Sequence, residues 1–132
     1  MTNRVPAILV VDDDLDQAAI VSTVLGCRPG SPPVTVYGDG DALLADLLDA
    51  PAGALVLVDR RLGAAESFDL IARSSALRPE IRFVMLSALI TPADRIRAVA
   101  CGAALALDKP SGLVGWRALL DEVLERSGTR AA

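Results

Sequence analysis

The 132-residue sequence contains no histidine, and this absence excludes several kinds of site. It removes the serine–histidine and cysteine–histidine pairs of nucleophilic catalysis, and it excludes this chain as the phosphohistidine carrier of a relay. A zinc site would have few ligands, because the two cysteines, Cys27 and Cys101, lie far apart and show no metal-binding spacing. We interpret both as small buried residues in a reducing compartment. Any chemistry must therefore use carboxylates, hydroxyls, a lysine or a bound metal.

Aromatic residues and long hydrophobic runs are also scarce. Aromatic residues make up 3% of a sequence that is 52% hydrophobic, so the core must be built from valine, leucine, isoleucine and alanine. No apolar run reaches the length of a bilayer span, and the N-terminal stretch lacks a signal-peptide cleavage pattern, so we expect a cytoplasmic protein. The net charge of −4 argues against nucleic acid as a direct partner. The length fits one domain, which we expect over residues 1–127, followed by a flexible tail at 128–132.

Short apolar runs alternate with segments of helical spacing along the whole chain. The runs predict strands at residues 7–11, 34–37, 54–58, 81–86 and 104–107. The intervening segments predict helices at residues 15–25, 41–48, 67–77, 92–101 and 113–124. Three of the runs are almost continuously hydrophobic, which is typical of parallel strands covered on both faces. The alternation predicts an α/β fold with a parallel sheet and helices on both faces.

Acidic residues stand where two of these strands end. The first strand leads into Asp12, Asp13 and Asp14, and the third leads into Asp59. Ligands of open parallel sheets bind at the carboxyl ends of the strands, so we expect at least three carboxylates to converge there. Their mutual repulsion requires a cation, and oxygen ligands favour Mg²⁺. The simpler interpretation, a solvated strand end that caps the next helix, suits Asp14 but leaves the position of Asp59 unexplained.

Two further strand ends add a hydroxyl and an ammonium group. Ser87 and Ala88 follow the fourth strand, and Lys109 follows the fifth. Alone, Ser87 is more often a turn residue and Lys109 more often a surface charge. At the same edge of the sheet as the acids, they supply the groups that hold a phosphoryl oxygen beside a metal.

Four motifs in this order resemble the receiver domain of bacterial response regulators over nearly the whole chain. They are Val10-Val11-Asp12-Asp13, Leu57-Val58-Asp59, Leu86-Ser87-Ala88 and Lys109-Pro110. The resemblance implies a doubly wound, five-stranded, flavodoxin-like fold with strand order 2-1-3-4-5. It also implies that Asp59 accepts a phosphoryl group from a sensor histidine kinase or a histidine phosphotransfer protein, and that the chain then switches a downstream protein. Such a switch catalyses only phosphotransfer to, and slow hydrolysis from, its own aspartate.

The resemblance assigns a role to each site residue. Mg²⁺ would be bound by Asp12 through water, and directly by Asp13, Asp59 and the backbone carbonyl of Arg61. Ser87, Ala88 and Lys109 would bind the phosphoryl group or act in the switch. The Lys109–Pro110 peptide would be cis, as is usual in the family.

The sequence departs from the family pattern at several positions. Gly63 replaces a proline, so we expect a looser loop, and Ser67 replaces a glycine. Arg61 could shield the phosphoryl group or be a solvated surface charge.

The larger departure is Ala106, at a position that usually carries tyrosine or phenylalanine. In the family, the hydroxyl residue at the position of Ser87 is coupled to this aromatic ring. With alanine at position 106 that coupling cannot operate. The sequence pattern therefore does not specify how the signal reaches the surface of the fourth helix, fifth strand and fifth helix. A homodimer could also form through this surface. Leu89 and Ile90 could be an output contact or, as we prefer, a lid over the site.

Two other functions are compatible with part of the pattern. Asp12 and Asp14 have the Asp-x-Asp spacing of haloacid-dehalogenase-like phosphatases, but that interpretation leaves Asp59 without a role and needs a longer chain with a cap. A phosphorylation-independent, receiver-like interaction module is the other alternative.

Overall fold

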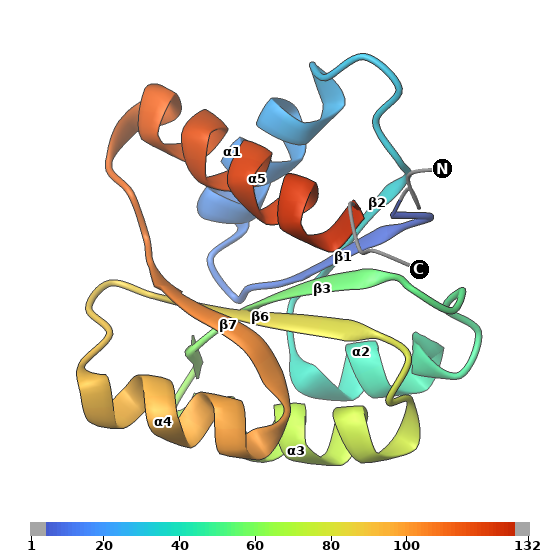
Figure 1. Cartoon of the computed structure of the whole chain (residues 1–132), viewed down its shortest axis with the longest axis vertical. Helices are drawn as coiled ribbons and strands as arrows, with labels where there is room; N and C mark the ends of the chain where they lie inside the picture. The colour runs from blue at the N-terminus through green and yellow to red at the C-terminus, as the bar shows by residue number, and fades with distance from the viewer. Residues whose placement is uncertain (1–4, 129–132) are drawn as a thin grey trace.

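A parallel five-stranded sheet lies between two layers of helices in the computed structural model, which describes residues 5–128 (Figure 1). The strands are β1 (Ile8–Val11), β2 (Val34–Tyr37), β3 (Leu55–Asp59), β6 (Arg82–Ser87) and β7 (Ala103–Asp108). Their order in the sheet is β2-β1-β3-β6-β7, and all neighbouring pairs are parallel. The predicted doubly wound fold and the strand order 2-1-3-4-5 are confirmed.

Five helices connect the strands and cover both faces of the sheet (Figure 1). The helices α1 (Leu15–Gly26) and α5 (Gly112–Gly128) lie on one face, and α2 (Gly40–Leu47), α3 (Phe68–Leu77) and α4 (Pro92–Cys101) lie on the other. The predicted strand and helix limits agree with these bounds to within one residue, except at the C-terminal end of α5. Among residues 5–128, no helix combines the length and the apolar character that crossing a membrane would require.

Polar side chains cap three of these helices at their N-termini and fix where each one begins. The Asp14 carboxylate accepts from the backbone N–H groups of Asp16 and Gln17 at the start of α1. Asp39 caps α2, and Thr91 begins α4 with a reciprocal capping box. The caps on α1 and α4 therefore also fix the loop after β1, which carries Asp12 and Asp13, and the loop after β6.

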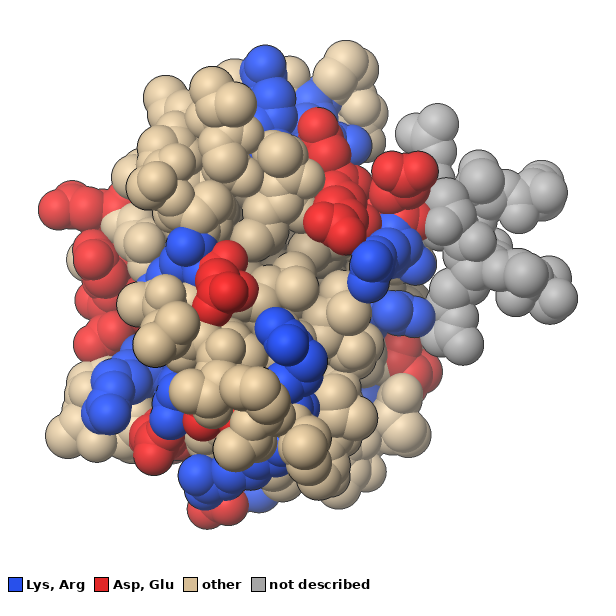
Figure 2. Space-filling view, turned by 60° about the vertical axis from the view of Figure 1, so that its left-hand side comes forward, with Lys and Arg blue, Asp and Glu red and all other residues tan. Residues whose placement is uncertain are grey.

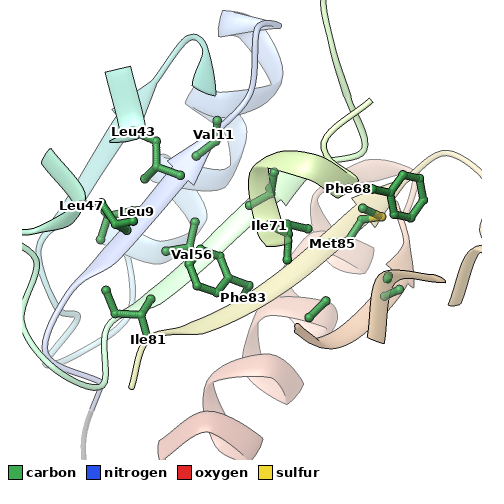
Figure 3. Close-up of a cluster of buried hydrophobic side chains, with 14 of the residues drawn as sticks. Leu9, Val11, Leu43, Leu47, Val56, Phe68, Ile71, Ile81, Phe83 and Met85 are labelled. Atoms are coloured by element: carbon green, nitrogen blue, oxygen red, sulfur yellow. The ribbon is translucent and has the colours of Figure 1, made fainter. Parts of the chain in front are cut away.

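The alternation of side chains along each strand divides the core into two clusters. Leu9 and Val11 of β1 point toward α2 and α3 with Phe68 and Phe83 (Figure 3), whereas Ile8 and Val10 point toward α1 and α5. Both sets are buried, as the continuous hydrophobic runs predict for strands covered on two faces. Helices thus pack against both faces of the sheet, and the strand ends that carry the acidic residues are held in fixed register.

A short antiparallel hairpin between β3 and α3 was not predicted. It consists of β4 (Arg61–Leu62) and β5 (Ala65–Glu66). Gly63, at its tip, has φ +65° and donates its backbone N–H to Asp13 Oδ2 at 2.8 Å. Proline could neither adopt this φ nor donate this hydrogen bond. The segment for which we expect a looser loop is thus a hairpin whose tip is hydrogen-bonded to the acidic cluster.

Two smaller expectations concern the cysteines and the C-terminal tail. Cys27 is exposed and Cys101 half-buried, so the prediction that both cysteines are buried was wrong. Cys27 caps the C-terminal end of α1 at the surface, where its backbone N–H bonds Thr23 and Leu25 carbonyls. Of the predicted tail, Gly128 belongs to α5, and residues 129–132 lie outside the described residues.

Candidate functional site

Three carboxylates meet at the carboxyl edge of the sheet. Val11 of β1 is paired with Val58 of β3, so the residues that follow, Asp12 and Asp59, are held side by side. Asp12, Asp13 and Asp59 each offer one oxygen, and these oxygens all lie within 4.8 Å of one another. Asp12 is only 5% exposed, whereas Asp13 lies at the surface. The structure therefore brings together the three acidic residues that the sequence predicts.

The electrostatics of this cluster favour a divalent cation. Burial raises the pKa of Asp12 to about 6, and the negative charge of Asp59 contributes to the increase, against a hydrogen bond from the Asp14 backbone that lowers it. A carboxylate in this position is stabilised by added positive charge. Three carboxylates face one lysine here, so the donor set fits Mg²⁺, which prefers oxygen ligands.

Lys109 supplies the ammonium group of the site. Its Nζ lies 2.9 Å from Asp59 Oδ2 and 4.0 Å from Asp12 Oδ2, and its side chain is 16% exposed. The Lys109 backbone N–H bonds the Ser87 carbonyl at 2.7 Å, which ties the end of β7 to the end of β6. The described residues contain no cis peptide bond, so the expected cis Lys109–Pro110 peptide is wrong, and Lys109 reaches Asp59 with a trans peptide.

Ser87 lies at the same edge, but its hydroxyl is directed elsewhere. The side chain is buried, and Oγ donates to the Leu89 carbonyl at 3.3 Å. A hydroxyl has one proton to donate, so Ser87 does not donate to a site carboxylate in this arrangement. Ala88 follows it and is exposed. Ser87 follows Leu86, the residue of β6 that is paired with Asp59, and its hydroxyl would have to rotate in order to point into the site.

The two departures at Arg61 and Ala106 have different surroundings. Arg61 is exposed in β4, and its backbone N–H lies 3.4 Å from Asp59 Oδ1. Ala106 is 2% exposed and belongs to the same buried cluster as Met85 and Ile90. Leu89, by contrast, is 69% exposed. Leu89 and Ile90, which we expect to act together as an output contact or a lid, therefore lie in different places. Ile90 packs into the core, and Leu89 stays at the surface.

Gln17, which contacts the site, and Arg60, which lies next to Asp59, were not predicted from the sequence. Gln17, in the first turn of α1, accepts a hydrogen bond through Oε1 from Lys109 Nζ. Arg60, directly after Asp59, pairs with Asp94 of α4 at 2.7 Å and with Glu66 at 3.0 Å. The only signals in the sequence are the i,i+4 spacing of Gln17 from Asp13 and the adjacency of Arg60 to Asp59. Neither signal specifies a partner.

The surface around this edge carries charges of both signs. Figure 2 turns forward the left-hand side of Figure 1, where the loops that follow β1 and β6 lie. Acidic and basic side chains are interspersed there with wide stretches of uncharged surface. Neither sign of charge covers this face as a whole.

Comparison with known proteins agrees with this geometry. The sequence model of the response regulator receiver domain matches residues 8–123. The fold is similar to that of a CheY-like response regulator receiver domain protein from Methanospirillum hungatei JF-1, with TM-score 0.79, 23% identity and coverage of 93% of this chain and 94% of that chain. No curated protein gives a significant match to the chain.

Two further solved structures with this fold are of a phosphorylated and of a metal-bound response regulator. The phosphorylated cyanobacterial phytochrome response regulator RcpA has TM-score 0.78 and 19% identity, with 92% of each chain covered. The Mn(2+)-bound form of response regulator Rcp1 has TM-score 0.77 and 20% identity, with 96% of this chain and 99% of that chain covered. At these identities the likeness establishes the fold alone.

Proposed function

Because the chain belongs to the response regulator receiver domain family, we propose that Asp59 accepts a phosphoryl group from a sensor histidine kinase or a histidine phosphotransfer protein in a Mg²⁺-dependent reaction. The observation that carries the proposal is the position of Asp59. Its carboxylate stands within 4.8 Å of two other carboxylates and 2.9 Å from the Lys109 ammonium. The surrounding acids would hold the metal, and the lysine would hold the incoming charge.

The proposed step is a phosphoryl transfer between two nucleophiles. A carboxylate oxygen of Asp59 attacks phosphorus, an O–P bond forms, and the P–N bond to the donor histidine breaks. The electron pair of that bond leaves with the imidazole nitrogen, which takes up a proton. Lys109 neutralises one phosphoryl oxygen, and the Ser87 hydroxyl, after rotating away from Leu89, donates to another.

The metal would be held by Asp12, Asp13, Asp59 and the backbone carbonyl of Arg61. When bound, Mg²⁺ supplies positive charge that lets a carboxylate approach an anionic phosphoryl group. Phosphorylated RcpA and Mn(2+)-bound Rcp1, which share this fold, are consistent with such a site. The burial that raises the pKa of Asp12 supports the same assignment, because it leaves an acid that a cation would stabilise.

The signal would leave through the surface of α4, β7 and α5. Ile96 and Val99 of α4 are 73% and 54% exposed, so apolar contact area is available there for a downstream protein or a second copy of the chain. We place this switch in the cytoplasm, with residues 1–127 as the receiver domain. We also propose that the chain slowly hydrolyses the acyl phosphate formed on Asp59.

Phosphorylation by a small donor tests the proposal. The full chain is incubated with acetyl phosphate and Mg²⁺, and its intact mass is measured. One added phosphoryl group is expected, and it should disappear in Asp59→Asn and when EDTA removes the metal. Asp41→Asn, an exposed acid at the start of α2, is the matched control and should be phosphorylated normally.

Two outcomes would contradict the proposal in different ways. A chain that gains no phosphoryl mass under any donor, with Asp59→Asn behaving like the native protein, would point to a phosphorylation-independent interaction module. Continuous phosphate release that depends on Asp12 rather than on Asp59 would favour a dehalogenase-like phosphatase.

A further inference from the structure

Lys109 has a second, uncharged hydrogen-bond acceptor that the acidic cluster does not explain. Its Nζ donates to Gln17 Oε1 as well as to Asp59 Oδ2. Gln17 lies in the first turn of α1, and Lys109 follows β7, so the contact joins segments that are 92 residues apart. The ammonium is thereby held between the helix on one side and the acceptor aspartate on the other.

The backbone around Gln17 is fixed independently of this contact. The Asp14 carboxylate accepts from the Gln17 backbone N–H at 3.2 Å, and the Asp14 backbone N–H is itself bonded to Asp12 Oδ1 at 2.9 Å. The Gln17 backbone is therefore held, through Asp14, at the same strand end that carries Asp12. Gln17 is half-buried, so its carboxamide is partly shielded from water.

The Lys109 stem is confined as well. Lys109 lines a small cavity together with Asp12, Asp59 and Trp116, beneath the site on the α1–α5 side of the sheet. A lysine side chain has four flexible bonds, and its charged end normally samples many positions. Here the stem is packed, and the free end has two oxygen partners in direct contact.

We propose that Gln17 is a positioning residue for phosphorylation, and that it acts by holding the Lys109 ammonium toward the phosphoryl-accepting oxygen of Asp59. This inference rests on the proposed function of Asp59. A neutral carboxamide suits the task, since it accepts one ammonium hydrogen without cancelling the positive charge that the phosphoryl group requires. When the phosphoryl group arrives, Lys109 turns one hydrogen to it and keeps another on Gln17.

Gln17→Met removes the acceptor oxygen and preserves the length and flexibility of the side chain. With acetyl phosphate and Mg²⁺, we expect the phosphorylation rate constant to fall by about tenfold, the effect of losing one hydrogen bond to a charged group. Ala19→Met places the same side chain at an exposed position of α1 and should leave the rate unchanged. Unfolding in urea shows whether each variant is as stable as the native chain.

Dependence on Lys109 separates positioning from a structural role. In a Lys109→Met background, Gln17→Met should have no further effect on the rate. In the native background, Gln17→Met should shift the ¹⁵Nζ and Cε NMR signals of Lys109, and Ala19→Met should not. A tenfold loss that persists without Lys109, or unchanged Lys109 signals in Gln17→Met, would overturn the proposal.

The same measurements keep the two proposals distinguishable. If the native chain takes no phosphoryl group, the function proposed for Asp59 fails, and the role of Gln17 fails with it. If the native chain is phosphorylated and Gln17→Met matches its rate, the inference about Gln17 alone is wrong.

Discussion

Arg60 Nη1 lies 2.7 Å from Asp94 Oδ2, so the residue next to Asp59 is paired with the first turn of α4. The same Asp94 carboxylate accepts from the Thr91 backbone N–H, and this hydrogen bond is the main reason why the pKa of Asp94 lies below its ordinary value. Arg60 also lies over the ring of Phe68, with its guanidinium carbon 5.6 Å from the ring centre. The β3–α3 loop is thus connected to α4 by charge, in a chain that has alanine at position 106.

A double-mutant cycle measures this connection. Arg60→Met, Asp94→Asn and the double variant are unfolded in urea, and we expect a small favourable coupling free energy, because the two charged groups lie within hydrogen-bond distance. Asp94→Asn also weakens the helix cap, which the cycle subtracts. A coupling that is zero within error would show that the two charges merely lie near each other.

Restoring an aromatic residue at position 106 should destabilise the protein. Ala106 is 2% exposed within a packed cluster, so we expect Ala106→Tyr to lower the free energy of unfolding by about 1–3 kcal/mol. Ala104→Tyr, at an exposed position of the same strand, is the control and should change stability far less. Equal stability of Ala106→Tyr and the native chain would mean that the core has room for the ring.

The raised pKa of Asp12 makes stability depend on pH. Because the folded chain holds this proton up to about pH 6 and the unfolded chain releases it near pH 4, the Asp12 contribution weakens stability as pH rises between these values. In EDTA at pH 7, Asp12→Asn should therefore be more stable than the native chain by roughly 1–2 kcal/mol, and the gain should vanish below pH 4. Urea unfolding across this range checks it. A gain that grows toward low pH would have the wrong sign.

Gly102 ends α4 in a conformation that other residues rarely adopt. Its φ is +113°, and a Cβ atom there would lie 2.3 Å from Ser75 Oγ. We expect Gly102→Ala to lower the free energy of unfolding by about 2–3 kcal/mol, through backbone strain and the displaced serine. Gly26→Ala, where a Cβ meets nothing within 4 Å, should be neutral or slightly stabilising in thermal unfolding.

Gly63 should tolerate asparagine and reject proline. Asparagine accepts positive φ and keeps the N–H that bonds Asp13, whereas proline loses both. In Gly63→Pro, we expect hydrogen exchange at the Ser67 amide, which closes the hairpin on the Arg60 carbonyl, to become at least about tenfold faster. Unchanged exchange in the proline variant would show that the hairpin forms without the Gly63 contact.

The sequence predicted the parts of this fold that depend on long-range burial. Continuous runs such as the one before Asp59 require cover on both faces, and together with their alternation with helical segments they lead to a parallel sheet. It also places Asp12 and Asp59 at one edge. The hairpin of β4 and β5 escaped prediction because two-residue strands are too short to show a period.

Side-chain partners were harder to predict than strand ends. The Lys109–Gln17 contact depends on the path of one lysine stem, and the Arg60–Asp94 pair depends on where α4 packs. The exposure of Cys27 runs against the general preference of cysteine for the interior, because the C-terminal end of α1 lies at the surface. Ala106 could be identified from the family resemblance, but the burial of Ile90 in the same cluster could not.

The bond from the Gly63 amide to Asp13 also restricts how this sequence can change over time. A single exchange of Gly63 for the proline that the family usually carries would remove a donor from the Asp13 carboxylate and demand a backbone angle that the ring forbids. Proline could enter at this position only together with a different turn between β4 and β5. The two residues, 50 positions apart, therefore cannot be substituted independently of each other.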